Sequence, residues 1–285
     1  MRPLTSTDLD GPIALDDDLV IEADAALVLP CLPDGAFELI YIDPPFNTGQ
    51  PRRARRVSVE RDEIAGERTG FAGRRYRSRE LSDIVYADSF ADYSAFLRPK
   101  LERARELLAP EGTLYVHLDY REAHYVKVSL DEIFGRDCFL NEIIWAYDYG
   151  GKPTRRWPAK HDTILVYVRD PQRYLFDAQA VEREPYMAPG LVSAEKAARG
   201  KRPTDTWWHT IVPTNGPERT GYPTQKPEGV LRRIVAASSR PGGWCLDFFA
   251  GSGTLGAVAA KLGRRYVLVD SNPEAIAVMR ARLGA

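Results

Sequence analysis

The chain has few cysteines and histidines, and it lacks any long apolar run. Its three cysteines, Cys31, Cys138 and Cys245, and its four histidines show neither a disulfide framework nor the spacing of metal ligands, so we expect no metal site. No stretch approaches the roughly 18 apolar residues that a membrane helix needs. Residues 1–18 are polar and acidic, unlike a secretory signal. We therefore expect a cytoplasmic protein without membrane contact.

Lysine is also scarce, because 31 of the 39 basic residues are arginine. Ten arginines and only four acids fall between residues 51 and 79, a local charge of +6, whereas the whole chain carries −1. A codon bias towards arginine would explain the overall ratio but not this clustering. A single basic segment in an otherwise acidic chain is typical of a contact with a polyanion, to whose phosphates the planar arginine fork is well suited.

The apolar pattern predicts an α/β fold. With 285 residues, 44% of them hydrophobic, the chain can form one large core or two small domains. Residues 51–79 resemble a charged loop, and residues 171–221 an irregular insert or small lobe. Strands and helices alternate near the C-terminus, as in a parallel sheet. We predict strands at 19–21, 37–42, 113–118, 142–147, 163–168, 244–247 and 266–269, and helices at 93–108 (with a kink or restart at Pro99), 230–235, 255–262 and from 273 onwards.

A glycine-rich turn at residues 251–254 follows the strand that ends at Asp247. Such a turn lets the backbone approach a ligand closely, and Asp270 at the end of the next strand is placed to bind a ribose hydroxyl. The G-x-G-x-x-G pattern of nicotinamide dehydrogenases is also met, by Gly251, Gly253 and Gly256. Only 29 residues follow Gly256, however, too few for the two βαβαβ halves of a dinucleotide domain.

A second motif, Asp43-Pro44-Pro45-Phe46, follows the apolar strand at 37–42. The two prolines fix the backbone and remove N–H donors, so that carbonyl groups there can point at a ligand. A carboxylate, a bare carbonyl and an aromatic ring suit a planar substrate with an exocyclic amine; a rigid strand-to-loop turn is the alternative interpretation. Because parallel sheets bind ligands at the carboxyl ends of their strands, we expect this motif and the glycine turn to share one rim.

The motifs resemble those of the S-adenosylmethionine-dependent DNA amino-methyltransferases. Asp-Pro-Pro-Phe precedes Phe-x-Gly-x-Gly, the order of the β group, and Thr224-Gln225-Lys226-Pro227 before an amphipathic helix is similar to that group's remaining cofactor motif. The resemblance implies a Rossmann-like methyltransferase fold: a mostly parallel, seven-stranded sheet with helices on both faces, circularly permuted. It also implies one catalytic domain over 1–285, with a core at about 14–50, 81–170 and 222–285, a basic DNA-contacting loop at 51–80 and a target-recognition insert at 171–221.

The implied cofactor is S-adenosylmethionine. Gly251 and Gly253 would pass under its methionine part, with Thr254 nearby. Asp270 would bind the ribose hydroxyls, Asp24 would lie at the adenine edge, and Lys226 would meet the carboxylate. The whole set that the resemblance implies for cofactor binding is Asp24, Thr224, Lys226, Pro227, Asp247, Phe249, Gly251, Ser252, Gly253, Thr254 and Asp270.

The implied reaction is methyl transfer to a base that is flipped out of the duplex. The catalytic residues that the resemblance implies are Asp43, Pro44, Pro45 and Phe46. Flipping costs a few kcal/mol, which stacking on Phe46 would partly offset. Asp43 and the Pro44 carbonyl would accept the two N–H bonds of the amine. In the family, Asp-Pro-Pro-Phe usually accompanies the N6 amine of adenine, and the N4 amine of cytosine is the nearest alternative. A non-catalytic nucleic-acid-binding module and a nicotinamide dehydrogenase are more distant alternatives.

Double-stranded DNA is the implied partner. The candidates for contact combine arginines of the basic segment with a stretch at 145–161 where aromatic and basic residues alternate: Arg52, Arg53, Arg55, Arg56, Arg74, Arg75, Tyr147, Tyr149, Lys152, Arg155 and Arg156. Trp145 and Tyr147 fit equally well as core aromatics of a strand. Base recognition is expected in the insert, where Trp207, Trp208 and His209 stand out. The resemblance also implies a homodimer, a cognate restriction endonuclease and a nucleoid-associated location in the cytoplasm.

Overall fold

The computed structural model describes all residues of the chain except 49–51, 62–67, 70–74, 87, 214 and 285. At its centre is a nine-stranded sheet in the order β1-β2-β12-β11-β3-β7-β9-β8-β10. Neighbouring strands are parallel except where β9 pairs with β7 and β8. The strands are β1 (Arg2–Thr5), β2 (Leu19–Glu22), β3 (Phe37–Ile42), β7 (Leu108–Leu118), β8 (Phe139–Ala146), β9 (His161–Val168), β10 (Thr206–Trp208), β11 (Trp244–Asp247) and β12 (Arg265–Asp270).

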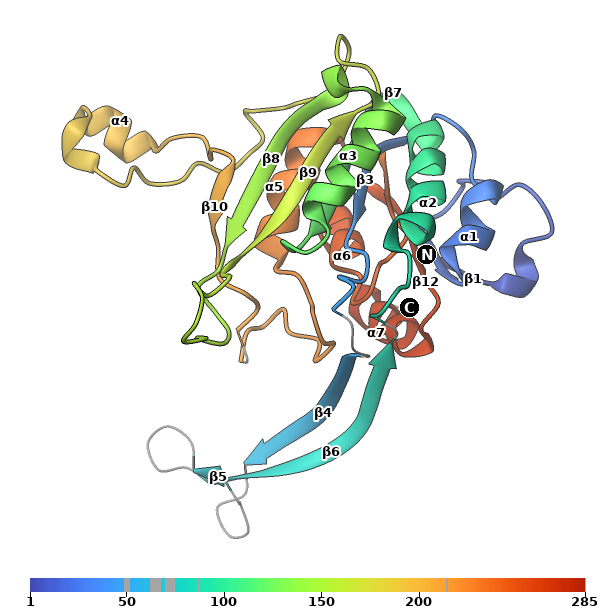
Figure 1. Ribbon diagram of the computed structural model, residues 1–285, viewed down its shortest axis with the longest axis horizontal. Coiled ribbons are helices and arrows are strands. Elements are labelled where there is room, and N and C mark those ends of the chain that lie inside the picture. Colours follow the sequence, from blue (N-terminus) through green and yellow to red (C-terminus); the bar gives the residue numbers. More distant parts are fainter. Residues whose placement is uncertain (49–51, 62–67, 70–74, 87, 214, 285) are drawn as a thin grey trace.

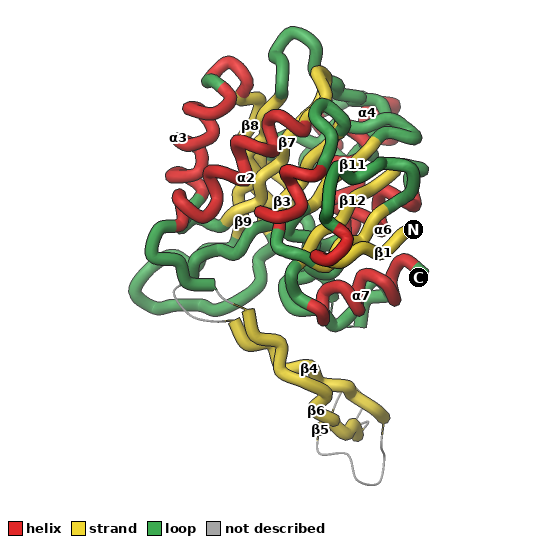
Figure 2. The backbone as a smooth tube through the Cα atoms, turned by 90° about the vertical axis from the view of Figure 1, so that its right-hand side faces the viewer, coloured by secondary structure: helices red, strands yellow, loops and turns green. Residues whose placement is uncertain are grey.

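Helices cover both faces of this sheet (Figure 1 and Figure 2). One face packs against α1 (Ala25–Val28), α2 (Tyr93–Leu107) and α3 (Ala123–Phe134). The other packs against α5 (Glu228–Ser238), α6 (Thr254–Lys261) and α7 (Pro273–Leu283). Strand β3 is apolar almost throughout because both of its faces are buried. Ile40 and Ile42 contact the first helix layer, whereas Leu39 and Tyr41 contact the second.

The expected α/β fold with a mostly parallel sheet is confirmed, but the expected count of seven strands is wrong. Two short strands, β1 and β10, extend the sheet at its two edges. Neither contains three consecutive apolar residues, as β2 and β11 do, and pairing with a formed edge strand gives them their conformation. Helix α2 runs through Pro99 without the expected restart, and α3 was not predicted.

The basic segment is not a loop, contrary to expectation, but an antiparallel arm that projects from the body (Figure 1). Strands β4 (Arg52–Arg61) and β6 (Arg75–Tyr86) pair along their length, and the short β5 (Arg68–Thr69) joins β6. Arginine-rich strands lack the alternation of apolar and polar residues by which a half-buried strand is recognised in a sequence.

The insert at 171–221 contains little regular structure besides α4 (Ala194–Arg199) and β10. Short 3₁₀ turns complete the fold at η1 (Ser6–Asp8), η2 (Leu29–Cys31), η4 (Arg136–Cys138) and η5 (Pro189–Leu191). Among the described helices, none combines the length and apolar character that crossing a bilayer requires.

Candidate active site

Acidic residues gather at one edge of the sheet, where the carboxyl ends of parallel strands meet. Asp24 follows β2, Asp43 follows β3, and Asp247 and Asp270 end β11 and β12. Strands β3 and β11 are hydrogen-bonded neighbours, with Leu246 opposite Ile40. Two motifs far apart in the sequence are therefore side by side in the fold.

These acids line one cavity of about 320 Å³. Two predicted residues lie behind the lining, because Pro227 caps the start of α5 and Gly253 the start of α6. The expectation that both motifs share one rim is met. The predicted residues that line the cavity are Asp24, Asp43, Pro44, Pro45, Phe46, Thr224, Lys226, Asp247, Phe249, Gly251, Ser252, Thr254 and Asp270.

The glycine turn requires its glycines for two different reasons. Gly251 has φ +50° and donates its N–H to Asp270 Oδ2 at 2.8 Å, which ties the turn to the end of β12. Gly253 has φ +69°, and a Cβ there would lie 2.6 Å from Cγ of Met279. Side chains rarely adopt such φ values, so at Gly251 the backbone itself lines the cavity, whereas Gly253 packs against the core behind it.

Asp43 carries one free oxygen. Its Oδ2 forms an ion pair with Nζ of Lys226, which is 8% exposed and lies 5.1 Å from the ring centroid of Phe46. Its Oδ1 is buried and has no hydrogen-bond partner among the described residues. A buried acceptor without a donor is costly, and a ligand with an N–H group would satisfy it. Lys226, expected at a cofactor carboxylate, here contacts the acid of the other motif.

Two further carboxyl groups of the cavity have raised pKa values. Burial raises the pKa of Asp247 well above its usual range, and the nearby carboxylates of Asp43 and Asp270 add to the effect. Burial also raises the pKa of Asp270, against hydrogen bonds from backbone N–H groups that include that of Gly251. The negative charges of Asp43 and Asp270 beside Asp247 suit the cavity to a ligand that brings a positive charge.

A buried polar network supports Phe46 from behind. The ring of His117 stacks on that of Phe46 with centroids 6.2 Å apart, and His117 is fully buried. Its nitrogens contact Tyr41 Oη at 2.8 Å and Asp162 Oδ2 at 3.1 Å. Burial would raise the pKa of Asp162, but the hydrogen bond and charge of His117 and the charge of Lys226 outweigh it, so this pKa is lowered. The network fixes the position of the Phe46 ring.

Sequence reasoning missed an aromatic wall of the same cavity. Phe90 and Phe96 stack with their centroids 4.3 Å apart, and Phe96 lies 5.9 Å from Phe249. Lys100 places its Nζ 4.2 Å from the Phe96 centroid. Tyr222 also lines the cavity, beside Gly251. The close succession of aromatics at Phe90, Tyr93 and Phe96 was the available signal, but Tyr93 and Phe96 fit the spacing of a helix equally well, and Phe90 precedes that helix.

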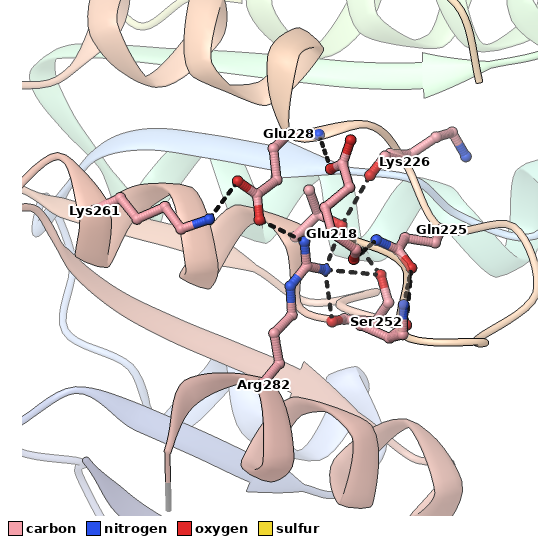
Figure 3. A network of polar contacts seen from close by, with 9 residues as sticks. Glu218, Gln225, Lys226, Glu228, Ser252, Lys261 and Arg282 are labelled. Carbon is pink, nitrogen blue, oxygen red and sulfur yellow. Dashed lines mark hydrogen bonds and ion pairs between the residues drawn. The ribbon is translucent and has the colours of Figure 1, made fainter. Parts of the chain in front are cut away.

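Thr224 and Lys226 of the Thr224–Pro227 motif line the cavity, and contacts outside the cavity hold the backbone of the motif in place. Thr224 has φ +61°, a conformation that β-branched residues rarely adopt. Gln225 points away from the cavity and accepts hydrogen bonds from N–H and Oγ1 of Thr220, both at 2.8 Å. Figure 3 shows Nζ of Lys226 directed away from Arg282, which lies in a polar cluster behind the motif.

The candidates for DNA contact divide into two groups. Arg52, Arg53, Arg55 and Arg56 lie on β4 and Arg75 on β6, whereas Arg74 is outside the described residues. Tyr149, Lys152, Arg155 and Arg156 are exposed on the loop between β8 and β9, which leaves the sheet at the same edge as the cavity. Tyr147 is only half buried, and its hydroxyl donates to Asp162 Oδ1 at 3.1 Å.

The tryptophans outside the motifs have distinct environments. Trp145 is 2% exposed and donates Nε1–H to the His209 carbonyl at 2.6 Å, so it is a core residue. Trp207, expected to contribute to base recognition, is 7% exposed, and its side chain packs from β10 into the core. Trp208 on the same strand and Trp157 on the β8–β9 loop are exposed. Alternation along β10 turns Trp207 inwards and Trp208 outwards.

Comparisons with known proteins agree with this geometry. The chain is 28% identical to the type II methyltransferase M.HpaI of Haemophilus parainfluenzae, over 94% of this chain and 74% of that protein. It is also 28% identical to the DNA adenine methyltransferase YhdJ of Escherichia coli strain K12, over 93% and 82% of the two chains.

Solved structures share the fold. A crystal structure of an M1.HpyAVI–SAM complex matches with a TM-score of 0.59 at 20% identity, over 93% of this chain and 98% of that chain. The cytosine-N4-specific PvuII DNA methyltransferase matches with a TM-score of 0.61 at 14% identity, over 92% and 85%.

The family model described as DNA methylase, that of the N6/N4 methyltransferases, matches residues 37–280. This span includes both the Asp43 motif and the glycine turn, and it assigns that turn to a methylase and not to a nicotinamide dehydrogenase. Because the match covers most of the chain, the protein belongs to the DNA methylase family of N6/N4 methyltransferases.

Proposed function

We propose that this DNA methyltransferase methylates the N6 amine of adenine in a base flipped out of double-stranded DNA. The observation that carries the proposal is the free, buried Oδ1 of Asp43 in the cavity that the glycine turn also lines. An exocyclic amine is a poor nucleophile because its lone pair is delocalised into the ring. Accepting its N–H bonds at Asp43 and at the Pro44 carbonyl favours a tetrahedral nitrogen and stabilises the positive charge that develops there.

The methyl donor is S-adenosylmethionine, which supplies an electrophilic methyl group when bound. The wall residues fit it chemically: backbone at Gly251 permits close approach, Asp270 and Asp24 offer acceptors for hydroxyl and amine groups, and the acidic cavity suits a sulfonium. The M1.HpyAVI structure, of the same fold, is a complex with this compound. What the chain contributes is alignment more than acid–base chemistry.

Adenine is favoured over cytosine for two reasons. The Asp-Pro-Pro-Phe motif usually accompanies adenine in the family that the sequence resembles, and YhdJ, a relative along most of the chain, is named a DNA adenine methyltransferase. The N4 amine of cytosine is the second candidate, because the PvuII enzyme of the same fold is cytosine-N4-specific. Asp43 would accept the N–H bonds of either amine.

Product identification tests the target base. Plasmid DNA is incubated with the protein and S-adenosylmethionine, digested to nucleosides and analysed by mass spectrometry. We expect N6-methyldeoxyadenosine. N4-methyldeoxycytidine without methylated adenine would contradict the proposal and support the second candidate.

DNA contact is proposed for the β4–β6 arm and for the β8–β9 loop. Both carry clustered cations, and the loop leaves the sheet beside the cavity. Base recognition is proposed for the insert at 171–221, with Trp208 exposed there.

The wider context follows from the relatives and the resemblance. M.HpaI is named a type II methyltransferase, which supports a restriction–modification role with a cognate endonuclease. We also propose a homodimer, and a circular permutation in which β3 precedes β11 along the chain.

A further inference from the structure

Arg282 lies behind the cavity, at the centre of the polar cluster in Figure 3. It comes from the last turn of α7, its side chain is 8% exposed, and it does not line the cavity. None of the motifs recognised in the sequence contains it, and it lies beyond the residues 37–280 that match the family.

The guanidinium joins two motifs that both line the cavity. On the side of the glycine turn, Nη1 donates to the Ser252 carbonyl at 3.2 Å and to Thr254 Oγ1 at 3.0 Å. On the other side, Nη2 donates to Glu228 Oε1 at 2.9 Å, one residue after the Thr224–Pro227 motif. Arg282 thus bridges two segments that share no strand.

A second bond closes the same connection. Thr254 Oγ1 donates to the Lys226 carbonyl at 3.1 Å, so the residue that Arg282 holds on the glycine turn also holds the backbone of Lys226. Lys226 in turn places its ammonium on Asp43. A chain of contacts therefore runs from Arg282 through Thr254 to Lys226 of the Thr224–Pro227 motif, and from Lys226 to Asp43.

The Thr224–Pro227 motif needs such support. Thr224 has φ +61°, and a strained residue keeps its conformation only when its surroundings impose it. Glu228 provides a fixed anchor next to it: its backbone N–H donates to Glu218 Oε2 at 2.8 Å, and its carboxylate accepts from Arg282 and Lys261. Burial would raise the pKa of Glu228, but the hydrogen bonds from Lys261 and Arg282 outweigh it and lower this pKa.

Lys261 provides the contrast. It donates to the other oxygen of Glu228 at 2.6 Å, but its side chain is 62% exposed and no bond links it to the glycine turn among the described residues. Of the two cations that contact Glu228, Arg282 also donates hydrogen bonds to the glycine turn, whereas Lys261 does not do so among the described residues.

We propose that Arg282 is a positioning residue for the cofactor, which holds the glycine turn and the Thr224–Pro227 motif at the separation that S-adenosylmethionine needs. The inference takes the identity of the cofactor from the proposed function and is independent of the target base. Without the fork of Arg282, the two walls sample other separations, and binding weakens in proportion to the fraction of molecules that hold the correct one.

The test compares Arg282→Met with Lys261→Met as a matched control. Affinity for S-adenosylhomocysteine is measured by calorimetry, and KM for S-adenosylmethionine and kcat by methyl transfer to DNA, at a temperature where circular dichroism shows each variant folded. For Arg282→Met we expect the Kd and KM to rise about tenfold or more, with kcat at saturating cofactor within about threefold of wild type. For Lys261→Met, which removes the exposed partner of the buried Glu228 carboxylate and leaves the bonds of Arg282 in place, we expect a Kd within about twofold of wild type.

A merely structural role would lower the melting temperature of Arg282→Met and leave the Kd of the folded protein unchanged, and that result would overturn the proposal. An equal loss of affinity in Lys261→Met would also overturn it.

If Arg282→Met does not fold, the variant Glu228→Gln tests the proposal instead. It keeps an acceptor for Arg282 but removes the negative charge, and we expect the Kd to rise about threefold. A wild-type Kd in that variant would also overturn the proposal. Failure of the wild-type protein to bind S-adenosylhomocysteine would instead refute the proposed function.

Discussion

Gly253 is the most tightly constrained residue of the glycine turn. It combines a left-handed backbone with close packing, since an added Cβ would lie 2.6 Å from Met279 Cγ. Gly242 is a natural control, because it has φ +81° and no described residue has an atom within 4 Å of an added Cβ. The two positions separate the cost of backbone conformation from the cost of packing.

We expect Gly253→Ala to lower the free energy of unfolding by about 2–4 kcal/mol, from left-handed strain plus overpacking. Gly242→Ala should show only the cost of strain, about 1–2 kcal/mol. Urea unfolding of both variants measures the difference. Equal decreases would show that the contact with Met279 does not constrain the turn.

At the residue scale, the sequence was informative where a motif concentrates chemistry in a few adjacent positions. Asp43, Gly251 and Asp270 were assigned to one rim because each follows or ends a strand, and the cavity contains all three. The ion pair of Lys226 with Asp43 was not foreseen, because spacing within one motif says nothing about which side chain of another motif it meets. Phe96 was missed for a similar reason, because its spacing from Tyr93 fits a helix whatever it contacts, and Phe90 precedes that helix.

The loop between β8 and β9 is the element on which DNA binding can be tested most cleanly. Arg155 and Arg156 are exposed there, near the cavity edge of the sheet. Arg136 is also exposed, but it precedes β8 and so lies at the opposite edge. Positive charge can therefore be removed at either edge, two charges in Arg155→Ala/Arg156→Ala and one in Arg136→Ala.

We expect the double variant Arg155→Ala/Arg156→Ala to weaken duplex binding and to reduce the slope of log K against log salt by about 1 for each phosphate that is no longer neutralised. The Kd for S-adenosylhomocysteine should not change. Arg136→Ala should leave both the affinity and the slope as in wild type. Fluorescence anisotropy of a labelled duplex over a range of salt concentrations measures both, and an unchanged slope in the double variant would contradict the proposed role of the loop.

At the element scale, apolar runs located every long strand of the sheet, because a strand buried on both faces must be apolar throughout. The same criterion failed for the arm. Strands β4 and β6 are rich in charge, and only pairing with each other gives them their structure. It also failed for β10, a three-residue strand that depends on the edge presented by β8.

For the whole molecule, the acidic rim makes stability depend on pH. Burial, together with Asp43 and Asp270, raises the folded-state pKa of Asp247 above the usual 3.8. The folded chain therefore keeps a proton that the unfolded chain has released. The contribution of Asp247 to the free energy of unfolding is fully present below pH 3.8 and is lost as the pH rises through the pKa of Asp247 in the folded state.

Asp247→Asn removes this titration and keeps an acceptor for the N–H of Phe249, which Asp247 Oδ1 accepts at 3.0 Å. We expect the free energy of unfolding of the variant, relative to wild type, to increase as the pH rises above 3.8. Urea unfolding at several pH values tests this, and a difference that does not vary with pH would contradict it.

The central claim is that Asp43 acts on the substrate amine and not on the cofactor, although both lie at one cavity. Asp43→Asn preserves the shape of the side chain and removes its charge. The most direct measurement combines its methyl-transfer rate on DNA with its Kd for S-adenosylhomocysteine. We predict a rate about 10²–10³-fold lower, with a Kd within about threefold of wild type. A wild-type rate, or a fall in rate explained entirely by weaker cofactor binding, would contradict the account.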